Sequence, residues 1–303
     1  GTHFTENVKK RYLLLGDHVT FLMREEALGE SANRYSAISS KQFNFVPVPN
    51  LMAPLDRIRN HNEAMRRIEA AVRSSDIVVA RIPSLVSRLA IRWARKLGKP
   101  YMIECVACNW DALWNHHWKA RVSAPWYFFK QRSVVAQSPY VIYVTDEFLQ
   151  RRYPTRGQQA AISNVELKAT PDSVLERRLQ RIRACTGESL PLRLVTVADV
   201  AVPYKGQGDI IEILPRLAQS EIKAEYHLVG GGDPTRLRDI ARRCGVSDRV
   251  VFHGTRSNQE VLELLDDLDI YVQPSRQEGL PRALIEEMSR GMPAFGARTG
   301  GIQ

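Results

Sequence analysis

Two glutamates with seven residues between them, Glu278 and Glu286, are the side chains of this sequence best spaced for chemistry. Gly279 permits a tight turn, and Pro281 suits the first position of a helix, where a missing N–H costs nothing. The N–H groups and the positive dipole of a helix start favour an anion such as a phosphate. Helical side chains lean toward the N-terminus, so Glu286 points there, and a carboxylate suits the vicinal hydroxyls of a ribose. The alternative is a surface helix with solvated glutamates.

The elements around this pair indicate the edge of a parallel sheet. Residues 269–273 form a short apolar run, which is typical of a buried parallel strand. A helical apolar face follows, and Gly291 ends it. This face consists of Ala283, Leu284, Ile285 and Met288. The strand therefore delivers a helix start to the carboxyl edge of a sheet.

The whole string from Pro274 to Gly291 resembles the retaining, nucleotide-sugar-dependent glycosyltransferases of the family 4 type, the glycosyl transferases group 1. Pro-Ser precedes Glu278, and Gly279, Leu280 and Pro281 stand inside the motif. The resemblance implies that Glu278 lies at the donor sugar and diphosphate, beside residues 279–281, and that Glu286 binds the ribose. It also implies a donor of the UDP-, GDP- or ADP-sugar type, no cofactor and no metal. No Asp-x-Asp motif stands out at a strand end.

Length and composition set outer limits. The 303 residues suit two domains of ordinary size. With 25% charged and 44% hydrophobic residues, the chain reads as globular and not disordered. No uncharged apolar run reaches the roughly 18 residues of a spanning helix, and no signal peptide is recognisable. Four cysteines do not make a disulfide framework, so we expect a cytoplasmic protein. The net charge of +10 favours an anionic partner.

Strand and helix patterns alternate along the chain, which predicts an α/β protein with parallel sheets. In the first half we expect strands at 19–23, 45–48, 77–80, 101–105 and 140–144, with helices at 55–72, 84–97 and 147–151. Ser84 is the expected N-cap of the helix that runs to Leu97. In the second half we expect strands at 192–198, 225–229, 250–252 and 270–272, with helices at 210–217, 235–243 and 261–268.

The stretch 162–191 lacks strands and carries mixed charge, so we place the domain boundary there. Residues 1–165 form the predicted acceptor-side domain and residues 166–303 the nucleotide-sugar domain. The resemblance implies the GT-B fold, in which two Rossmann-like, doubly wound domains face each other across a cleft. Against that family's pattern the chain looks truncated at both ends: a first strand is missing from the first domain, and closing helices are missing from the second.

Lys205 follows the first strand of the second half, at a position where a loop can reach a ligand. It matches the lysine of a basic pair that binds the diphosphate in the family. The arginine partner is absent, since Asp199 stands where an arginine is usual. A charged hydrogen bond contributes roughly 1.5–3 kcal/mol, so its loss would weaken donor binding about tenfold unless another cation substitutes. An exposed loop lysine is the alternative for Lys205.

Glycines follow two further strands of the second half. Three glycines are consecutive at 230–232, but the last glycine of the Gly-x-Gly-x-x-Gly dinucleotide fingerprint and its acidic residue farther along the chain are absent. By the resemblance this cluster around Gly231 lies beside the nucleotide, with a tight strand–helix turn as the alternative. Gly254 ends the next strand, where the family contacts the base through backbone atoms. We take His253 as a simple strand-end residue.

Asp111 lies past the end of a first-half strand and is a candidate for the polar group that faces the donor sugar; His116 and His117 are the alternatives. The nearby Cys105 and Cys108 suggest zinc or redox chemistry. However, adjacent histidines point in different directions, and a redox motif should open a helix whereas 109–111 reads as a loop. A packed pair of free thiols is the interpretation we adopt.

Aromatic and basic residues interleave in the irregular segment 105–132, from Trp114 to Arg132. This composition has three interpretations: a core with exposed bases, a nucleic-acid surface, or an interfacial patch for a lipid-linked acceptor. We expect no nucleic acid, and we keep an anionic membrane surface as a partner. The chain would then lie peripherally on the inner face of the cytoplasmic membrane.

The predicted function is transfer of a sugar, as by a retaining hexosyltransferase, from a nucleotide diphosphate to an acceptor hydroxyl in polysaccharide or glycolipid synthesis. Lys205, Glu278 and Asp111 are the predicted catalytic residues. Gly231, Gly254, Gly279, Leu280, Pro281 and Glu286 are predicted to bind the nucleotide sugar. The alternatives are another GT-B enzyme, namely a nucleotide-sugar epimerase or a sugar phosphorylase, and an incomplete domain that binds nucleotide without turnover.

Overall fold

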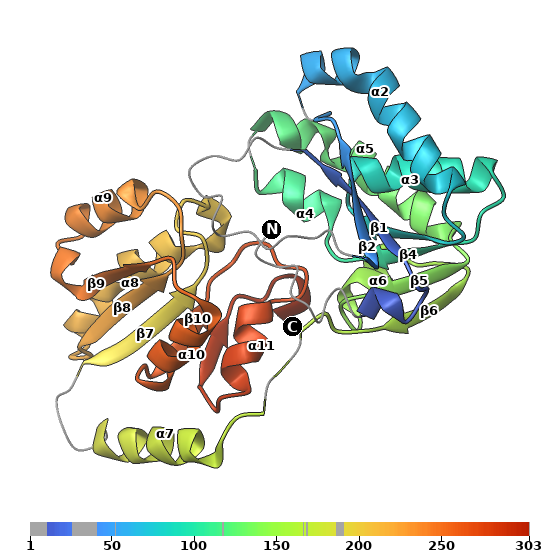
Figure 1. The fold of residues 1–303 in the computed structure, drawn as a ribbon. Coiled ribbons are helices and arrows are strands. Elements are labelled where there is room, and N and C mark those ends of the chain that lie inside the picture. Colours follow the sequence, from blue (N-terminus) through green and yellow to red (C-terminus); the bar gives the residue numbers. More distant parts are fainter. Residues whose placement is uncertain are drawn as a thin grey trace. The chain divides into compact units, whose positions relative to one another are not determined.

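The computed structural model describes residues 11–25, 41–51, 53–116, 118–165, 167, 169–185 and 191–302 (Figure 1). The chain divides into two compact units. Unit 1 comprises Gly1–Cys105, Gln131–Ile142 and Tyr153–Ala160, and unit 2 comprises Val106–Lys130, Tyr143–Arg152 and Ala161–Gln303. The chain thus crosses between the units several times, and the predicted division between residues 165 and 166 stays a prediction.

Unit 1 carries two sheets. A two-stranded parallel sheet pairs β1 (Val19–Arg24) with β2 (Phe43–Val48). A four-stranded sheet has the order β3-β4-β5-β6, in which β3 and β4 are parallel. Its strands are β3 (Val78–Ile82), β4 (Tyr101–Cys105), β5 (Tyr140–Tyr143) and β6 (Gln158–Ala161).

Two helices of unit 1 begin where local chemistry predicts. Pro54 occupies the start of α2 (Pro54–Arg73), where its missing N–H is not needed. Ser84 caps α3 (Leu85–Lys96), because its side chain accepts a hydrogen bond from the Ser87 N–H at 3.3 Å. The predicted cap at Ser84 is therefore confirmed.

Unit 2 contains a five-stranded sheet in the order β11-β10-β7-β8-β9, and every pairing in it is parallel. Its strands are β7 (Leu192–Val197), β8 (Ala224–Val229), β9 (Val250–Gly254), β10 (Ile270–Gln273) and β11 (Ala294–Gly296). The chain winds from β7 outward through β8 to β9, and then returns to add β10 and β11 on the other side of β7. The strand order therefore reverses between β7 and β10, which makes this point the topological switch of a doubly wound sheet.

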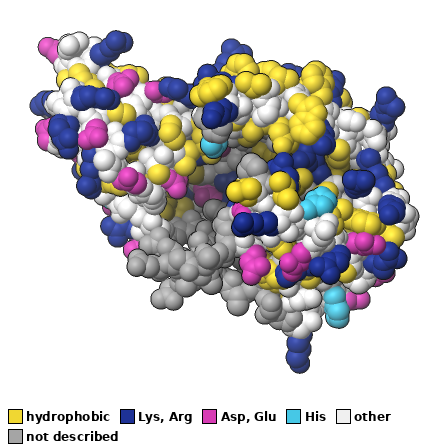
Figure 2. Space-filling model, turned by 90° about the horizontal axis from the view of Figure 1, so that it is seen from above, with side chains coloured by type: hydrophobic (Ala, Val, Ile, Leu, Met, Phe, Trp, Pro, Cys, Tyr) yellow, Lys and Arg dark blue, Asp and Glu magenta, His cyan; other side chains and the backbone are white. Residues whose placement is uncertain are grey.

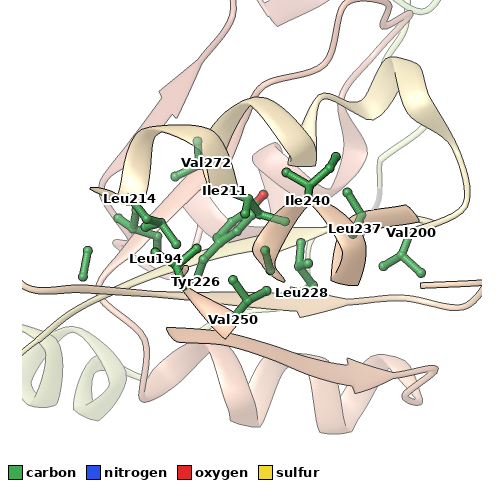
Figure 3. Close-up of a cluster of buried hydrophobic side chains, with 13 residues drawn as sticks. Leu194, Val200, Ile211, Leu214, Tyr226, Leu228, Leu237, Ile240, Val250 and Val272 are labelled. Atoms are coloured by element: carbon green, nitrogen blue, oxygen red, sulfur yellow. The ribbon is translucent and has the colours of Figure 1, made fainter. Parts of the chain in front are cut away.

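Helices cover both faces of this sheet and close a separate core on each. The helices are α8 (Gln207–Gln219), α9 (Thr235–Arg243), α10 (Asn258–Asp266) and α11 (Arg282–Met288). One core joins α8 and α9 to the sheet through residues such as Ile211, Leu214 and Leu237 (Figure 3). The other joins α10 and α11 through Leu265 and Leu284. Both faces are buried, as the apolar strands predicted.

The segment after β4 differs from the expectation of an irregular stretch. It forms α4 (Asn109–Trp114) and the long α5 (Trp118–Ala136), and the short α6 (Phe148–Arg152) follows β5. The prediction that 109–111 is a loop is wrong. Large aromatic residues all round α5 conceal the usual contrast between an apolar and a polar face, so the helical period is not visible.

A further helix, α7 (Asp172–Cys185), lies in the stretch proposed as the domain boundary. Its Arg178 is only 2% exposed. The guanidinium donates to the carbonyls of Leu268 (2.7 Å) and Leu265 (3.0 Å), which lie at the end of α10. Burial lowers the pKa of Arg178, and the nearby carboxylates of Asp266 and Glu287 act against this shift. The buried arginine therefore fastens α7 to the rest of unit 2.

The surface carries the excess of positive charge evident in the sequence. Lysine and arginine side chains are spread over the face seen in Figure 2, and hydrophobic side chains also gather on it. Among the described residues, no helix combines the length and the apolar character needed to cross a membrane.

Candidate functional site

The switch point of the unit 2 sheet brings Lys205 and Glu278 together. Lys205 lies in the short 3₁₀ turn Pro203–Lys205 after β7, and Glu278 lies in the loop after β10. The Lys205 ammonium donates to the Glu278 carboxylate at 2.7 Å, although 73 residues separate the two in the chain. The side chains are 22% and 11% exposed. Adjacent parallel strands place their carboxyl ends at one edge, which is why these two loops meet.

Close backbone packing holds the two loops in contact. Gly206 has φ +75°, and a Cβ built on it would lie 2.1 Å from the carbonyl oxygen of Pro274. The Arg276 N–H donates to the Tyr204 carbonyl at 2.8 Å. Only glycine combines this left-handed conformation with this lack of space. Gly206 therefore allows Lys205 to reach the loop of Glu278.

A chain of hydrogen bonds from buried side chains fixes the Glu278 carboxylate. Gln273, which is 3% exposed, donates from its amide to Glu278 Oε1 at 2.7 Å and to the Ser275 hydroxyl at 2.8 Å. Its amide oxygen accepts from the buried Tyr271 hydroxyl at 2.7 Å. The carboxylate of Glu278 thus sits at the end of a buried polar network, with Lys205 on its outer side.

The motif loop 278–281 packs against two other backbone segments of unit 2. Gly301 donates its N–H to the Gly279 carbonyl at 3.0 Å, and a Cβ on Gly300 would lie 1.9 Å from the Glu278 carbonyl oxygen. A Cβ on Gly279 would lie 2.4 Å from the Val106 carbonyl oxygen. Leu280 is partly buried. The loop is therefore rigid, and Gly279 is required for lack of space.

The helix after this loop differs in two details from the prediction. Pro281 is the N-cap residue and Arg282 begins α11, so the proline stands one position earlier than expected. The apolar face of α11 also differs from the predicted one. Met288 is 59% exposed, whereas Glu287 is 1% exposed and packs inward with Leu284, three residues before it.

Glu286, the predicted ribose ligand, lies on α11 with its side chain 26% exposed. Partial burial raises the pKa of Glu286, and the Arg282 guanidinium, 4.0 Å away on the preceding turn, acts against that shift. Its neighbour Glu287 has a pKa raised to about 8, chiefly by burial and then by the charge of Glu286. One carboxylate of this pair stays accessible, and the other is held in the core.

Predicted glycines converge at the same edge of the sheet, beyond β7, β8 and β9. The Gly230 N–H donates to the Gly254 carbonyl at 2.9 Å, and a Cβ on Gly230 would lie 2.1 Å from the Ala198 carbonyl oxygen. The Gly231 carbonyl accepts from the Val200 N–H at 2.9 Å. These contacts bring Gly231 and Gly254 to adjacent strand ends.

Asp199, which stands where an arginine was expected, has a local partner. Its carboxylate accepts from the Ala201 N–H at 2.8 Å, as in an Asx turn. The side chain closes the loop after β7 and leaves Lys205 as the cation of this loop that approaches Glu278.

Asp111 lies in the first turn of α4 and contacts neither Lys205 nor Glu278 through a described hydrogen bond. Its carboxylate accepts from Arg152 Nη1 at 2.8 Å, and the same nitrogen lies 3.1 Å from Cys108 Sγ. The helix of Asp111 nonetheless reaches the loop after β10, because Asn115 at its end donates to the Arg276 carbonyl at 3.2 Å. His117 lies outside the described residues.

Three residues of this region escaped the sequence analysis. Gln273 and Glu287 are buried polar side chains inside apolar patterns, and for Glu287 the three-residue spacing from Leu284 was an available signal. His227 on β8 pairs with His253, whose ring nitrogen lies 3.0 Å from His227 Nδ1. Burial lowers the pKa of both histidines. Among the described residues, no group of three or more His, Cys, Asp or Glu side chains could hold a metal ion.

Comparison with known proteins finds a family match in the second half of the chain. Residues 181–303 match the family described as "Glycosyl transferases group 1". Protein CapJ of Staphylococcus aureus is 27% identical over 98% of this chain, which spans 74% of that protein. The amylovoran biosynthesis glycosyltransferase AmsK of Erwinia amylovora is 33% identical, but this match covers only 37% of the chain and 29% of AmsK.

The solved structures agree in fold. HepE (Alr3699) of Anabaena, in a crystal structure with UDP, matches 85% of this chain and 68% of its own with a TM-score of 0.58. The sequences are only 16% identical, so this likeness concerns the fold alone. It confirms the predicted GT-B class of α/β proteins with parallel sheets.

The buried Glu287 makes the stability of unit 2 depend on pH. Its pKa of about 8 in the folded chain lies above the ordinary value of 4.5, so between these pH values the folded state keeps a proton that the unfolded state has lost. The free energy of unfolding should therefore fall as the pH rises through this window, by at most about 1.4 kcal/mol per pH unit. Glu287→Gln, which carries no such charge, should exceed the parent chain in stability by about 2–4 kcal/mol at pH 8 and by much less at pH 5.

Urea unfolding at pH 5, 6.5 and 8 measures this difference. Glu286→Gln on the same turn is the matched control: it keeps the buried Glu287, so its stability should fall with rising pH nearly as steeply as that of the parent chain. Parallel stability curves for Glu287→Gln and the parent chain would contradict a buried, protonated Glu287.

Proposed function

We propose that this chain, whose residues 181–303 match the family of glycosyl transferases group 1, transfers a glycosyl group from a nucleoside diphosphate sugar to an acceptor hydroxyl. The proposed reaction retains the configuration at the anomeric carbon. The observation that carries the proposal is the 2.7 Å contact between Lys205 and Glu278 at the switch point of the unit 2 sheet. Ligands of open parallel sheets bind outside the carboxyl ends of the strands at this point.

Lys205 is the proposed partner of the leaving diphosphate. An ammonium group has several N–H donors, so Lys205 can bind a phosphate oxygen while another of its hydrogens stays on Glu278. A cation that is already in place where negative charge develops stabilises the transition state more than the ground state. Glu278 then holds the lysine in position on one side and faces the donor sugar on the other. Residues 279–281 line the same phosphate region.

The nucleoside would lie along the glycine-lined edge. Gly231 and Gly254 offer backbone surface to the base, and Glu286 accepts hydrogen bonds from the vicinal ribose hydroxyls. Asp111 is the proposed polar group toward the donor sugar, with its carboxylate oriented by Arg152. None of these roles calls for a metal ion or an organic cofactor.

The donor and the acceptor are proposed by class. UDP, GDP and ADP sugars are the candidate donors, and the structurally similar HepE was crystallised with UDP. The relationship to AmsK supports a role in polysaccharide or glycolipid synthesis. A lipid-linked acceptor would bring a cytoplasmic chain to the inner face of the cytoplasmic membrane.

A second candidate function is nucleotide binding without turnover. It is favoured by Asp199, because a carboxylate engaged in a local turn cannot replace the arginine of the family's basic pair. A diphosphate at this edge would then meet one cation fewer, a difference of roughly 1.5–3 kcal/mol.

The ribose assignment predicts the effect of Glu286→Ala on nucleotide affinity. One or two hydrogen bonds to hydroxyls are lost, so the dissociation constant should rise about tenfold or more in isothermal titrations with UDP, GDP and ADP. Glu263→Ala, which removes an exposed glutamate of α10, should leave the affinity unchanged. Equal affinities for Glu286→Ala and the parent chain would remove Glu286 from the site.

Turnover separates the two candidate functions. Incubation with a panel of nucleotide sugars, with water as the acceptor, should release free nucleoside diphosphate at an undiminished rate in EDTA. The anomeric configuration of the released sugar, read by proton NMR before mutarotation, should match the donor's. Loss of activity in EDTA would refute metal independence, and an inverted product would refute retention. Tight nucleotide binding with no release from any donor would favour the second candidate.

A further inference from the structure

Helix α5 is buried along one face and carries large apolar side chains on the opposite, exposed face. Ala124, Gln131 and Val135 are all at most 2% exposed and form its inner face. On the outer face lies a stripe of large apolar side chains spaced four, four and three residues apart. The stripe comprises Trp118 (70% exposed), Val122 (78%), Trp126 (58%) and Phe129 (64%). Residues at this spacing follow one another along a single side of a helix, so the stripe is continuous.

Such a stripe is unfavourable in water. A contiguous exposed apolar patch marks an interaction site. Aromatic packing also holds the start of this surface rigid. Trp110 stacks on Trp114 with ring centroids 5.1 Å apart, and Phe128 of α5 contacts Trp110 edge to face at 5.9 Å. The patch is therefore a preformed surface.

Cations flank the stripe on both sides. At about 100° per residue, Lys119 and Lys130 fall along one margin, and Arg121 and Arg132 fall along the other. The Lys130 ammonium lies 4.2 Å from the centroid of the Trp126 ring, and Lys119 lies 5.6 Å from that of Trp118. No Asp or Glu occurs in the sequence between Asp111 and Asp146. The partner of this surface should accordingly be apolar at its centre and anionic around it.

Two other partners fit less well. A second copy of the chain that used the same face would bring both sets of four cations together without a carboxylate from this segment to offset them. Nucleic acid would stack its bases on open aromatic faces. Here the Trp114 ring is stacked on Trp110, the Trp126 ring is approached by Lys130, and Val122 at the centre offers no stacking surface.

We propose that the outer face of α5 is a docking surface for an anionic lipid bilayer. Trp118, Val122, Trp126 and Phe129 would enter the interface between headgroups and acyl chains, while the flanking lysines and arginines contact the lipid phosphates. The helix would lie in the plane of the membrane and would not cross it. Access to a lipid-linked acceptor rests on the proposed function, whereas the binding itself is independent of it.

Vesicle co-sedimentation tests the proposal with two double variants. The chain should bind vesicles of phosphatidylglycerol and phosphatidylcholine (about 3:7) at low salt, and bind pure phosphatidylcholine at least about tenfold more weakly. Trp118→Ser with Trp126→Ser should lower the partition coefficient on anionic vesicles at least about tenfold. Lys119→Gln with Lys130→Gln should lower it about 25-fold, or about fivefold per cation.

Matched controls remove the same chemistry elsewhere. Tyr140→Ser with Phe295→Ser takes away two exposed aromatic side chains, and Arg242→Gln with Arg243→Gln on α9 takes away two exposed charges. Each should change binding less than about threefold. Absence of vesicle binding by the parent chain at low salt, or equal losses for test and control variants, would overturn the proposal.

Further measurements exclude the competing partners and a folding artefact. The parent chain should sediment as a monomer without lipid; a dimer that Trp118→Ser with Trp126→Ser dissociates would overturn the proposal. Binding to a single-stranded oligonucleotide but not to anionic vesicles would also overturn it. The variants should keep the parent's thermal unfolding and its affinity for UDP, GDP or ADP. A chain that binds vesicles but no nucleotide would contradict the proposed function and leave the docking surface standing.

Discussion

The ion pair between Lys205 and Glu278 depends on one constraint, the order of the parallel strands in unit 2. Because β10 returns to the side of β7 opposite β8, the loops after β7 and β10 leave the sheet as neighbours and in different directions. Their side chains meet at 2.7 Å although the chain between them builds most of the sheet. The site thus follows from the strand order of the unit 2 sheet. Its two charged residues, Lys205 and Glu278, belong to no common local motif.

Backbone proximity gives this arrangement its rigidity. Gly206, Gly279 and Gly300 each leave less than 2.5 Å between a notional Cβ and a carbonyl oxygen of a facing segment. Beneath them the buried network of Tyr271, Gln273 and Ser275 supports the Glu278 carboxylate. A charged group held by such a network does not have to reorganise when a ligand arrives, which is the condition for electrostatic stabilisation of a transition state.

Sequence reasoning succeeded where burial follows a simple period. The apolar strands could be predicted because parallel strands buried on both faces appear as short apolar runs. The cap at Ser84 could be predicted because a serine stands directly before a helical apolar pattern. It failed where tertiary contacts determine burial. In α11 the core accepts Glu287 and leaves Met288 in solvent, and α5 has no polar face to reveal its period. The pairing of Asp111 with Arg152 and the burial of Arg178 under α10 are contacts across many residues, which no local pattern contains.

The central claim is that Glu278 holds Lys205 toward the diphosphate of a bound nucleotide, and the coupling between the two side chains tests it most directly. Isothermal titration measures the loss of affinity caused by Lys205→Met, once in the parent chain and once in a chain that carries Glu278→Gln, with whichever of UDP, GDP or ADP binds most tightly. We predict a loss of about tenfold in the parent chain and of less than about threefold in the Glu278→Gln background, since the lysine is no longer held there. Equal losses in the two backgrounds would contradict the account.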